Sequence, residues 1–170
     1  HDLEEALKIG STITIMEGGR IVQSGKPEDI VLRPANDYVR EFIANVNPLS
    51  VLTAWHVMRD ARDLEKAGDG WVWLDRRKTT RFKLDKDNTV IDAERNGQKS
   101  TWVSCDQAED TVDETQHPVF WANPGTSLRT VMLAMHKSHT APVGLFDDQS
   151  RFVGAIGVRD VLQAVLRREG

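Results

Sequence analysis

The order of apolar segments between residues 116 and 170 constrains the fold more than any other feature of the sequence. Five segments in this stretch have the length and periodicity of buried strands or amphipathic helices. They are a strand at residues 119–121, a helix capped by Thr126 or Ser127 with Leu128, Val131, Met132 and Met135 inward, strands at residues 142–146 and 152–156, and a final helix capped by Asp160. The order strand, helix, strand, strand, helix predicts a small α+β domain.

Residues 1–47 read as a separate group of short elements. The pattern predicts a helix at residues 2–9, a hairpin of strands at residues 12–16 and 21–23, a helix opened by Pro27, and a helix at residues 37–44. The run Asn45-Val46-Asn47-Pro48 breaks the last helix, so the boundary is predicted after residue 47.

Residues 48–115 are less regular. Residues 51–58 have the pattern of a strand and a short helix. Further strands are predicted at residues 71–74, 81–84, 90–94 and 101–105, the second and third flanking a turn at Asp87-Asn88. The acidic stretch 106–114 is predicted to be a solvated linker. Three regions follow, at residues 1–47, 48–115 and 116–170.

Bulk properties exclude several classes of function. The net charge of -4 gives no reason to expect a nucleic-acid polymer as partner. The single cysteine, Cys105, excludes an intrachain disulfide, fits a reducing compartment and is predicted to be a buried, inert thiol. No apolar run approaches the ~20 residues that span a bilayer. The sequence begins with His1 rather than Met, which indicates a fragment, a processed product or a missing start.

Two parts of the first region resemble the end of an ABC transporter ATPase domain. The opening HDLEEAL resembles the switch-histidine segment, and residues 13–25 (ITIMEGGRIVQSG) resemble the hairpin that closes that domain. Pro34 with residues 37–42 (DYVREF) is similar to the version in quaternary-amine uptake subunits. In such subunits two CBS repeats follow the ATPase domain.

The rest of the chain resembles those CBS repeats. Residues 119–166 have the strand, helix, strand, strand, helix order of a CBS motif. Residues 52–58 (LTAWHVM) resemble a CBS lead-in, but the long amphipathic helix expected next is weak, so this first repeat is degenerate. The resemblance implies an α+β fold in which a tandem CBS pair, expected to form a dimer, follows the C-terminal end of an ABC nucleotide-binding domain.

The resemblance also assigns a role to His1. In the parent ATPase this histidine would contact the γ-phosphate of ATP and help to position the attacking water, with ATP and Mg as cofactors. The 170 residues contain no Gly-x-x-x-x-Gly-Lys-Ser/Thr phosphate loop and no signature motif. His1 is therefore expected to be inert in this chain, which by itself is not an enzyme.

Asp160 is the candidate for small-molecule binding. CBS modules that bind adenine nucleotides share the run Gly-x-x-Thr/Ser-x-x-Asp, whose carboxylate accepts hydrogen bonds from ribose hydroxyls. Gly154 and Asp160 match this run, whereas Gly157 stands in place of the hydroxyl residue. The alternative interpretation makes Asp160 an ordinary helix N-cap, contributing about 1 kcal/mol.

A basic run offers a second candidate site. Six bases face two acids in residues 75–86; they are Arg76, Arg77, Lys78, Arg81, Lys83 and Lys86. Such a cluster can attract an anionic membrane surface in a way that salt screens, which would suit an ionic-strength sensor. A solvated strand edge is the other interpretation.

The patterns around the tryptophans and histidines favour structural roles over a ligand-binding or metal-binding site. Trp71 and Trp73 share a predicted strand face and could line a quaternary-ammonium cage, but core or interface packing is the expected role. His136 and His139 lack ligand partners at metal spacing and are expected to be surface residues, so no metal site is predicted.

These patterns together predict a regulatory CBS module of the ATPase subunit of a quaternary-amine (glycine betaine, choline or proline) ABC importer. It would modulate ATP-driven uptake, with ionic strength as the signal, from the cytoplasm on the inner face of the cell membrane. Its expected partners are a second copy, the permease and an anionic membrane surface. The alternatives are a CBS sensor of adenine nucleotide and a purely structural dimerisation domain.

Overall fold

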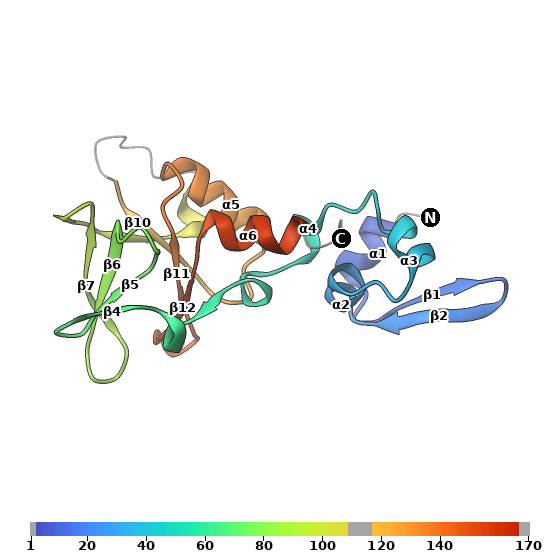
Figure 1. The fold of residues 1–170 in the computed structure, drawn as a ribbon, viewed down its shortest axis with the longest axis horizontal. Helices are drawn as coiled ribbons and strands as arrows, with labels where there is room; N and C mark the ends of the chain where they lie inside the picture. Colours follow the sequence, from blue (N-terminus) through green and yellow to red (C-terminus); the bar gives the residue numbers. More distant parts are fainter. Residues whose placement is uncertain (1–2, 109–116, 167–170) are drawn as a thin grey trace. The chain divides into compact units, whose positions relative to one another are not determined.

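The computed structural model describes residues 3–108 and 117–166, drawn in colour in Figure 1. The chain divides into two compact units. One contains residues 1–52 and 163–170, and the other contains residues 53–162. No helix among the described residues is long and apolar enough to cross a membrane.

The first unit is a hairpin with short helices. Its elements are α1 (Leu3–Ile9), β1 (Ile13–Glu17), β2 (Arg20–Gly25), α2 (Pro27–Leu32), α3 (Asp37–Phe42) and α4 (Pro48–Val51). Gly18 and Gly19 have φ of 55° and 78° and form the two-residue turn between the strands. Gln23 joins the hairpin to the turn after α2, because its side chain donates to the carbonyl oxygen of Arg33 at 3.0 Å and accepts from the backbone N–H of Ala35 at 2.8 Å.

The second unit is built on two five-stranded sheets. The first sheet has the order β3-β12-β11-β10-β9, with parallel pairs only at β9–β10 and β10–β11. Its strands are β3 (Arg59–Asp60), β9 (Trp102–Ser104), β10 (Val119–Ala122), β11 (Val143–Phe146) and β12 (Phe152–Ile156). Helix α5 (Leu128–Lys137) connects the parallel strands β10 and β11 and contacts both. Helix α6 (Val158–Leu166) follows β12.

The second sheet is an antiparallel meander. Its order is β4-β5-β6-β7-β8, and the strands are β4 (Lys66–Gly68), β5 (Trp71–Trp73), β6 (Thr80–Leu84), β7 (Val90–Arg95) and β8 (Gln98–Lys99). Side chains alternate along it: Phe82 and Ala93 are buried, whereas their neighbours Arg81 and Lys83 are only half-buried. One face therefore packs inward and the other faces solvent.

The two sheets share one hydrophobic core. Phe82 of β6 contacts Phe146 and Phe152 of the first sheet, with ring centroids 5.8 Å apart in both pairs. Gly144 makes this approach feasible, because a Cβ atom there would lie 2.3 Å from Cε2 of Phe82. Trp121 packs edge-on against Phe146 at 5.5 Å. The meander thus covers the face of the first sheet opposite α5.

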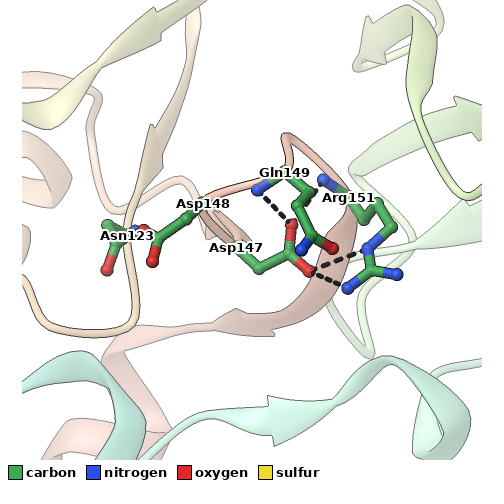
Figure 2. Close-up of polar contacts among 5 residues, drawn as sticks. All are labelled: Asn123, Asp147, Asp148, Gln149 and Arg151. Atoms are coloured by element: carbon green, nitrogen blue, oxygen red, sulfur yellow. Dashed lines mark hydrogen bonds and ion pairs between the residues drawn. The ribbon is translucent and has the colours of Figure 1, made fainter.

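The turn between β11 and β12 is fixed by Asp147, as Figure 2 shows. One carboxylate oxygen accepts the backbone N–H groups of Gln149 and Arg151, and the other accepts Nε of Arg151, each at 2.9 Å. These bonds hold the pKa of Asp147 below its usual value, with the backbone bond from Arg151 as the main cause. The neighbouring Asp148 accepts the side-chain amide of Asn123 at 2.9 Å, which ties this turn to the end of β10.

Most predicted elements are confirmed, and two details are wrong. Ser127 is the N-cap of α5 and accepts the N–H of Thr130, as expected. Asp160 is not the N-cap of the last helix, because α6 begins at Val158. No strand forms at residues 51–58, where α4 ends and a 3-10 turn at Ala54–His56 follows.

The region predicted to be a degenerate first repeat, residues 48–115, contains the meander. The described residues between β3 and β9 contain no α-helix, only a 3-10 turn at Ala61–Asp63 and the five strands β4 to β8. The weak helical pattern after residue 58 is consistent with this result, since alternating residues such as Trp71, Val72 and Trp73 specify a strand with one solvated face. The α+β class holds for the whole chain.

A candidate ligand site around Asp160

A cavity of about 390 Å³ lies at the start of helix α6, where the sequence predicts a ligand site. Its walls come from β3, the turn after β5, the loop before β11 and the first turn of α6. Gly157 and Asp160 line it, and so do Arg76 and Arg77. The structure therefore brings together residues from two sites that were predicted separately.

Asp160 is held by two donors. Its Oδ2 accepts the backbone N–H of Gly157 at 2.8 Å and Nε of Arg59 at 3.0 Å. The first bond satisfies an N–H group that the start of the helix leaves without a partner. The ion pair with Arg59 is largely buried, with the two side chains 22% and 16% exposed. A carboxylate has about four lone-pair sites, so this one retains capacity for a further donor such as a ribose hydroxyl.

Arg59 is the residue of this site that the sequence did not reveal. It lies on β3, 101 positions before its partner. Its Nη2 also donates to the carbonyl oxygen of Leu74 at 2.5 Å, so one guanidinium joins β3, the meander and α6. The only sequence signal was a base next to the predicted lead-in at residues 52–58.

The two glycines of the predicted run have different physical roles. A Cβ atom at Gly154 would lie 2.3 Å from the carbonyl oxygen of Arg59, so the pairing of β12 with β3 requires glycine there. At Gly157 a Cβ atom would meet nothing closer than Oδ2 of Asp160, at 3.5 Å. A serine or threonine would fit at residue 157, and the missing hydroxyl is not imposed by packing.

The charges that line the cavity favour an anion. Four arginines and two aspartates line it, namely Arg59, Arg76, Arg77, Arg159, Asp75 and Asp160. Because Arg59 and Asp160 neutralise each other, the other three arginines face a single acid. A cavity with this balance attracts phosphate-bearing ligands.

The turn that carries Arg76 and Arg77 is rigidly held. Asp75 accepts the backbone N–H groups of Thr79 and Thr80 at 2.9 and 3.1 Å, and the hydroxyl of Thr79 donates to it at 2.7 Å. Asp75 is therefore engaged within its own turn, and the backbone of the two arginines is fixed at the cavity.

The rest of the basic run does not gather at this cavity. Lys78 pairs with Glu65 at 2.5 Å, and Arg81 pairs with Glu94 on the solvent face of the meander. Lys86 lies beyond the end of β6, in the turn before β7. The six bases are thus distributed over both ends and one face of a five-residue strand.

Trp71 and Trp73 lie on that same solvent face, half-buried, and contact cations of this chain. The Arg81 guanidinium carbon is 4.3 Å from the ring centroid of Trp71 and 5.2 Å from that of Trp73. The ammonium group of Lys83 is 5.8 Å from Trp71. A quaternary ammonium ligand would have to displace Arg81 to reach both rings.

The remaining candidates carry little chemistry in the part of the chain that the structure describes. His1 lies outside the described residues. Cys105 is 3% exposed, and burial raises its pKa to about 12, which agrees with an inert thiol. His136 and His139 are exposed, as expected. Within residues 3–108 and 117–166, no group of three or more metal-ligating side chains is present.

Comparison with known families defines the class of the second unit. Residues 111–167 match the CBS domain family. Among solved structures, the chain is similar to the CBS domain of a bacterial CNNM/CorC family Mg2+ transporter, at 10% identity, with a TM-score of 0.49 over 75% of this chain and 84% of that one. The family match, over residues 111–167, identifies a CBS domain in that part of the chain.

Comparison with individual proteins extends the similarity along the chain. It is 33% identical over 178 residues to the glycine betaine/proline betaine transport system ATP-binding protein ProV of Salmonella typhimurium, covering 100% of this chain and 44% of that protein. It is 29% identical over 170 residues to the glycine betaine transport ATP-binding protein OpuAA of Bacillus subtilis, covering 98% and 40%. The homologues of this chain are thus glycine betaine ABC transporter ATP-binding subunits, and it spans less than half their length, including the CBS part.

Proposed function

We propose that the chain is the regulatory C-terminal part of the ATP-binding subunit of a quaternary-amine importer. Similarity along nearly the whole chain to two glycine betaine transport ATP-binding proteins carries this proposal. In it, residues 1–47 complete the nucleotide-binding domain, residues 48–115 are the degenerate first CBS repeat, and residues 116–170 are the second repeat. Transported substrates are glycine betaine, choline or proline betaine.

The match of residues 111–167 to the CBS domain family supports the regulatory role. ATP and Mg belong to the complete subunit, which works on the cytoplasmic side with a permease. The CBS repeats would pair two copies and bias the ATPase between productive and locked states. A coupling of about 1–3 kcal/mol is sufficient for such a bias.

The amine assignment is tested on the complete subunit assembled with its permease and binding protein in lipid vesicles. Glycine betaine or choline should stimulate ATP hydrolysis, whereas sulfate should not. Sulfate is the informative control, because a shorter stretch of this chain is 45% identical over 64 residues to a sulfate/thiosulfate import ATP-binding protein of Nocardia farcinica. Stimulation by sulfate alone would overturn the assignment.

A second candidate function is binding of adenine nucleotide at the Asp160 cavity. The excess of arginines there favours it, and the missing hydroxyl at Gly157 opposes it. We expect weak or undetectable binding by the natural chain and tighter binding of AMP or ATP by Gly157→Thr. Asp160→Ala should remove whatever binding calorimetry detects. A sub-micromolar affinity of the natural chain would make nucleotide the signal.

Ionic-strength sensing through residues 76–86 is the remaining proposal for the signal. Arg76, Arg77 and Lys86 are the bases of the run for which the structure gives neither an ion pair nor an aromatic contact among the described residues. Vesicles containing phosphatidylglycerol should bind the chain less well as salt rises. Equal binding by the natural chain and a variant with Arg76, Arg77 and Lys78 changed to alanine would leave the basic run as a solvated strand edge.

A further inference from the structure

A separate pocket of about 240 Å³ lies between the β7–β8 hairpin and the entry to β10, away from the residues that line the Asp160 cavity. Arg95, Lys99 and His117 line it together with Ser100 and Thr101. No acidic residue is among the lining residues that the structure describes. Its size is below the roughly 300–1,000 Å³ of pockets for drug-sized molecules, which restricts it to a small ligand or a headgroup.

The backbone of this pocket is fixed on both sides. Asn96 and Gly97 have φ of 52° and 77° and form a two-residue hairpin turn, and the N–H of Asn96 donates to the carbonyl oxygen of Thr79 at 2.7 Å. On the other side, the hydroxyl of Ser100 donates to the carbonyl oxygen of His117 at 2.9 Å. The basic groups are therefore presented by a preformed frame.

Arg95 is the unusual member of this group. Its Nη2 donates to the carbonyl oxygen of Ser138 at 2.5 Å, but its Nη1 is shielded from water and has no hydrogen-bond partner among the described residues. No acid pairs with it in that part of the chain, whereas the neighbouring Lys99 lies 3.5 Å from a carboxylate oxygen of Asp92. Burial lowers the pKa of Arg95. A guanidinium in this state lacks compensation for the hydration it has lost.

We propose that this pocket binds a phosphate group, with Arg95 as the principal source of positive charge. An anion in the pocket supplies the counter-charge that Arg95 lacks. The hydroxyl of Thr101 and the side chains of Lys99 and His117 offer further donors to the several oxygens of a phosphate. The phosphate is either free in solution or part of an anionic lipid, and the two sources share this chemistry. The inference does not depend on the identity of the transported substrate.

Titration of the 170-residue chain with inorganic phosphate, followed by NMR at constant ionic strength, tests the proposal. Saturable shifts are expected at Arg95, Ser100 and His117, and none of comparable size with chloride. Arg95→Gln should weaken binding about tenfold or more. Arg62→Gln is the matched control, because Arg62 is 88% exposed and pairs with Asp60, so phosphate binding should be unchanged.

Two further arms keep the result decisive. If Arg95→Gln does not fold, Lys99→Gln and His117→Ala must each weaken binding. Competition by phosphatidylglycerol vesicles would identify the lipid as the source of the phosphate, and its absence would identify the free anion. Shifts that follow chloride equally, map elsewhere, or persist in folded Arg95→Gln would overturn the proposal.

Discussion

The two sheets of the second unit differ in how many of their faces are buried. All four residues of β11 are buried, whereas β6 alternates between buried and half-buried positions. The first sheet is covered by α5 on one face and by the meander on the other, so its central strand is apolar throughout. The meander is covered on one face only, by the first sheet, and its solvent face carries tryptophans and charged residues. The comparison shows that a second sheet can cover one face of a buried sheet while a helix covers the other.

Phe82 is the strongest link between the two sheets, and its removal gives the largest expected effect. The side chain is fully buried against Phe146 and Phe152. Phe82→Ala should lower the free energy of unfolding by about 3–5 kcal/mol. Lys83→Ala, on the solvent face of the same strand, should cost about 1 kcal/mol or less. Urea denaturation measures both, and equal losses would contradict the two-faced description of the meander.

Gly154 tests the attachment of β3 to the first sheet. A methyl group there meets the backbone carbonyl of Arg59, which cannot move away without breaking the strand pair. We expect Gly154→Ala to destabilise the chain by about 1–3 kcal/mol. Gly25→Ala is the control, since its Cβ would lie no closer than 4.0 Å to a neighbouring atom, Cβ of Asp29. A neutral Gly154→Ala would show that β3 is not held as described.

The ion pair of Arg59 and Asp160 links β3 to α6 electrostatically. Arg59→Ala and Asp160→Ala should each cost about 1–2 kcal/mol, because each leaves a largely buried charge without its partner. The double variant should cost less than the sum of the two, giving a coupling energy of about 0.5 kcal/mol or more. Strict additivity in thermal or urea unfolding would mean that the pair contributes no interaction energy.

Asp60 on β3 should make the stability of the fold slightly dependent on pH in the acid range. Hydrogen bonds from Arg62 lower the pKa of Asp60 from 3.8 to about 2, and the bond from the Arg62 side chain is the main cause. Because the folded-state pKa is the lower one, this stabilisation is present above about pH 4 and is lost as the pH falls toward 2. The stability difference between the natural chain and Asp60→Asn should therefore shrink over this window. A difference that is constant from pH 5 to 2 would contradict the bond geometry.

Local sequence patterns were sufficient to predict most helices and strands. They were not sufficient to predict contacts between residues far apart in the sequence. The apolar run before Phe146 and the cap at Ser127 were readable because strand burial and helix capping depend on adjacent residues. The start of α6 was placed too late, because an aspartate in the first turn and one at the N-cap give the same local signal. The partnership of Arg59 with Asp160 depends on β3 pairing with β12, which no periodicity encodes.

Uptake of glycine betaine by the reconstituted importer, measured across a series of salt concentrations, tests the regulatory role most directly. The complete subunit is compared with one truncated after Leu52, which removes the second compact unit and residues 163–170 of the first. ATP hydrolysis is measured in parallel to confirm that the truncated subunit remains active. We expect uptake by the complete subunit to rise with ionic strength and uptake by the truncated subunit to be independent of it. The same salt dependence in both would contradict a regulatory role for the CBS module.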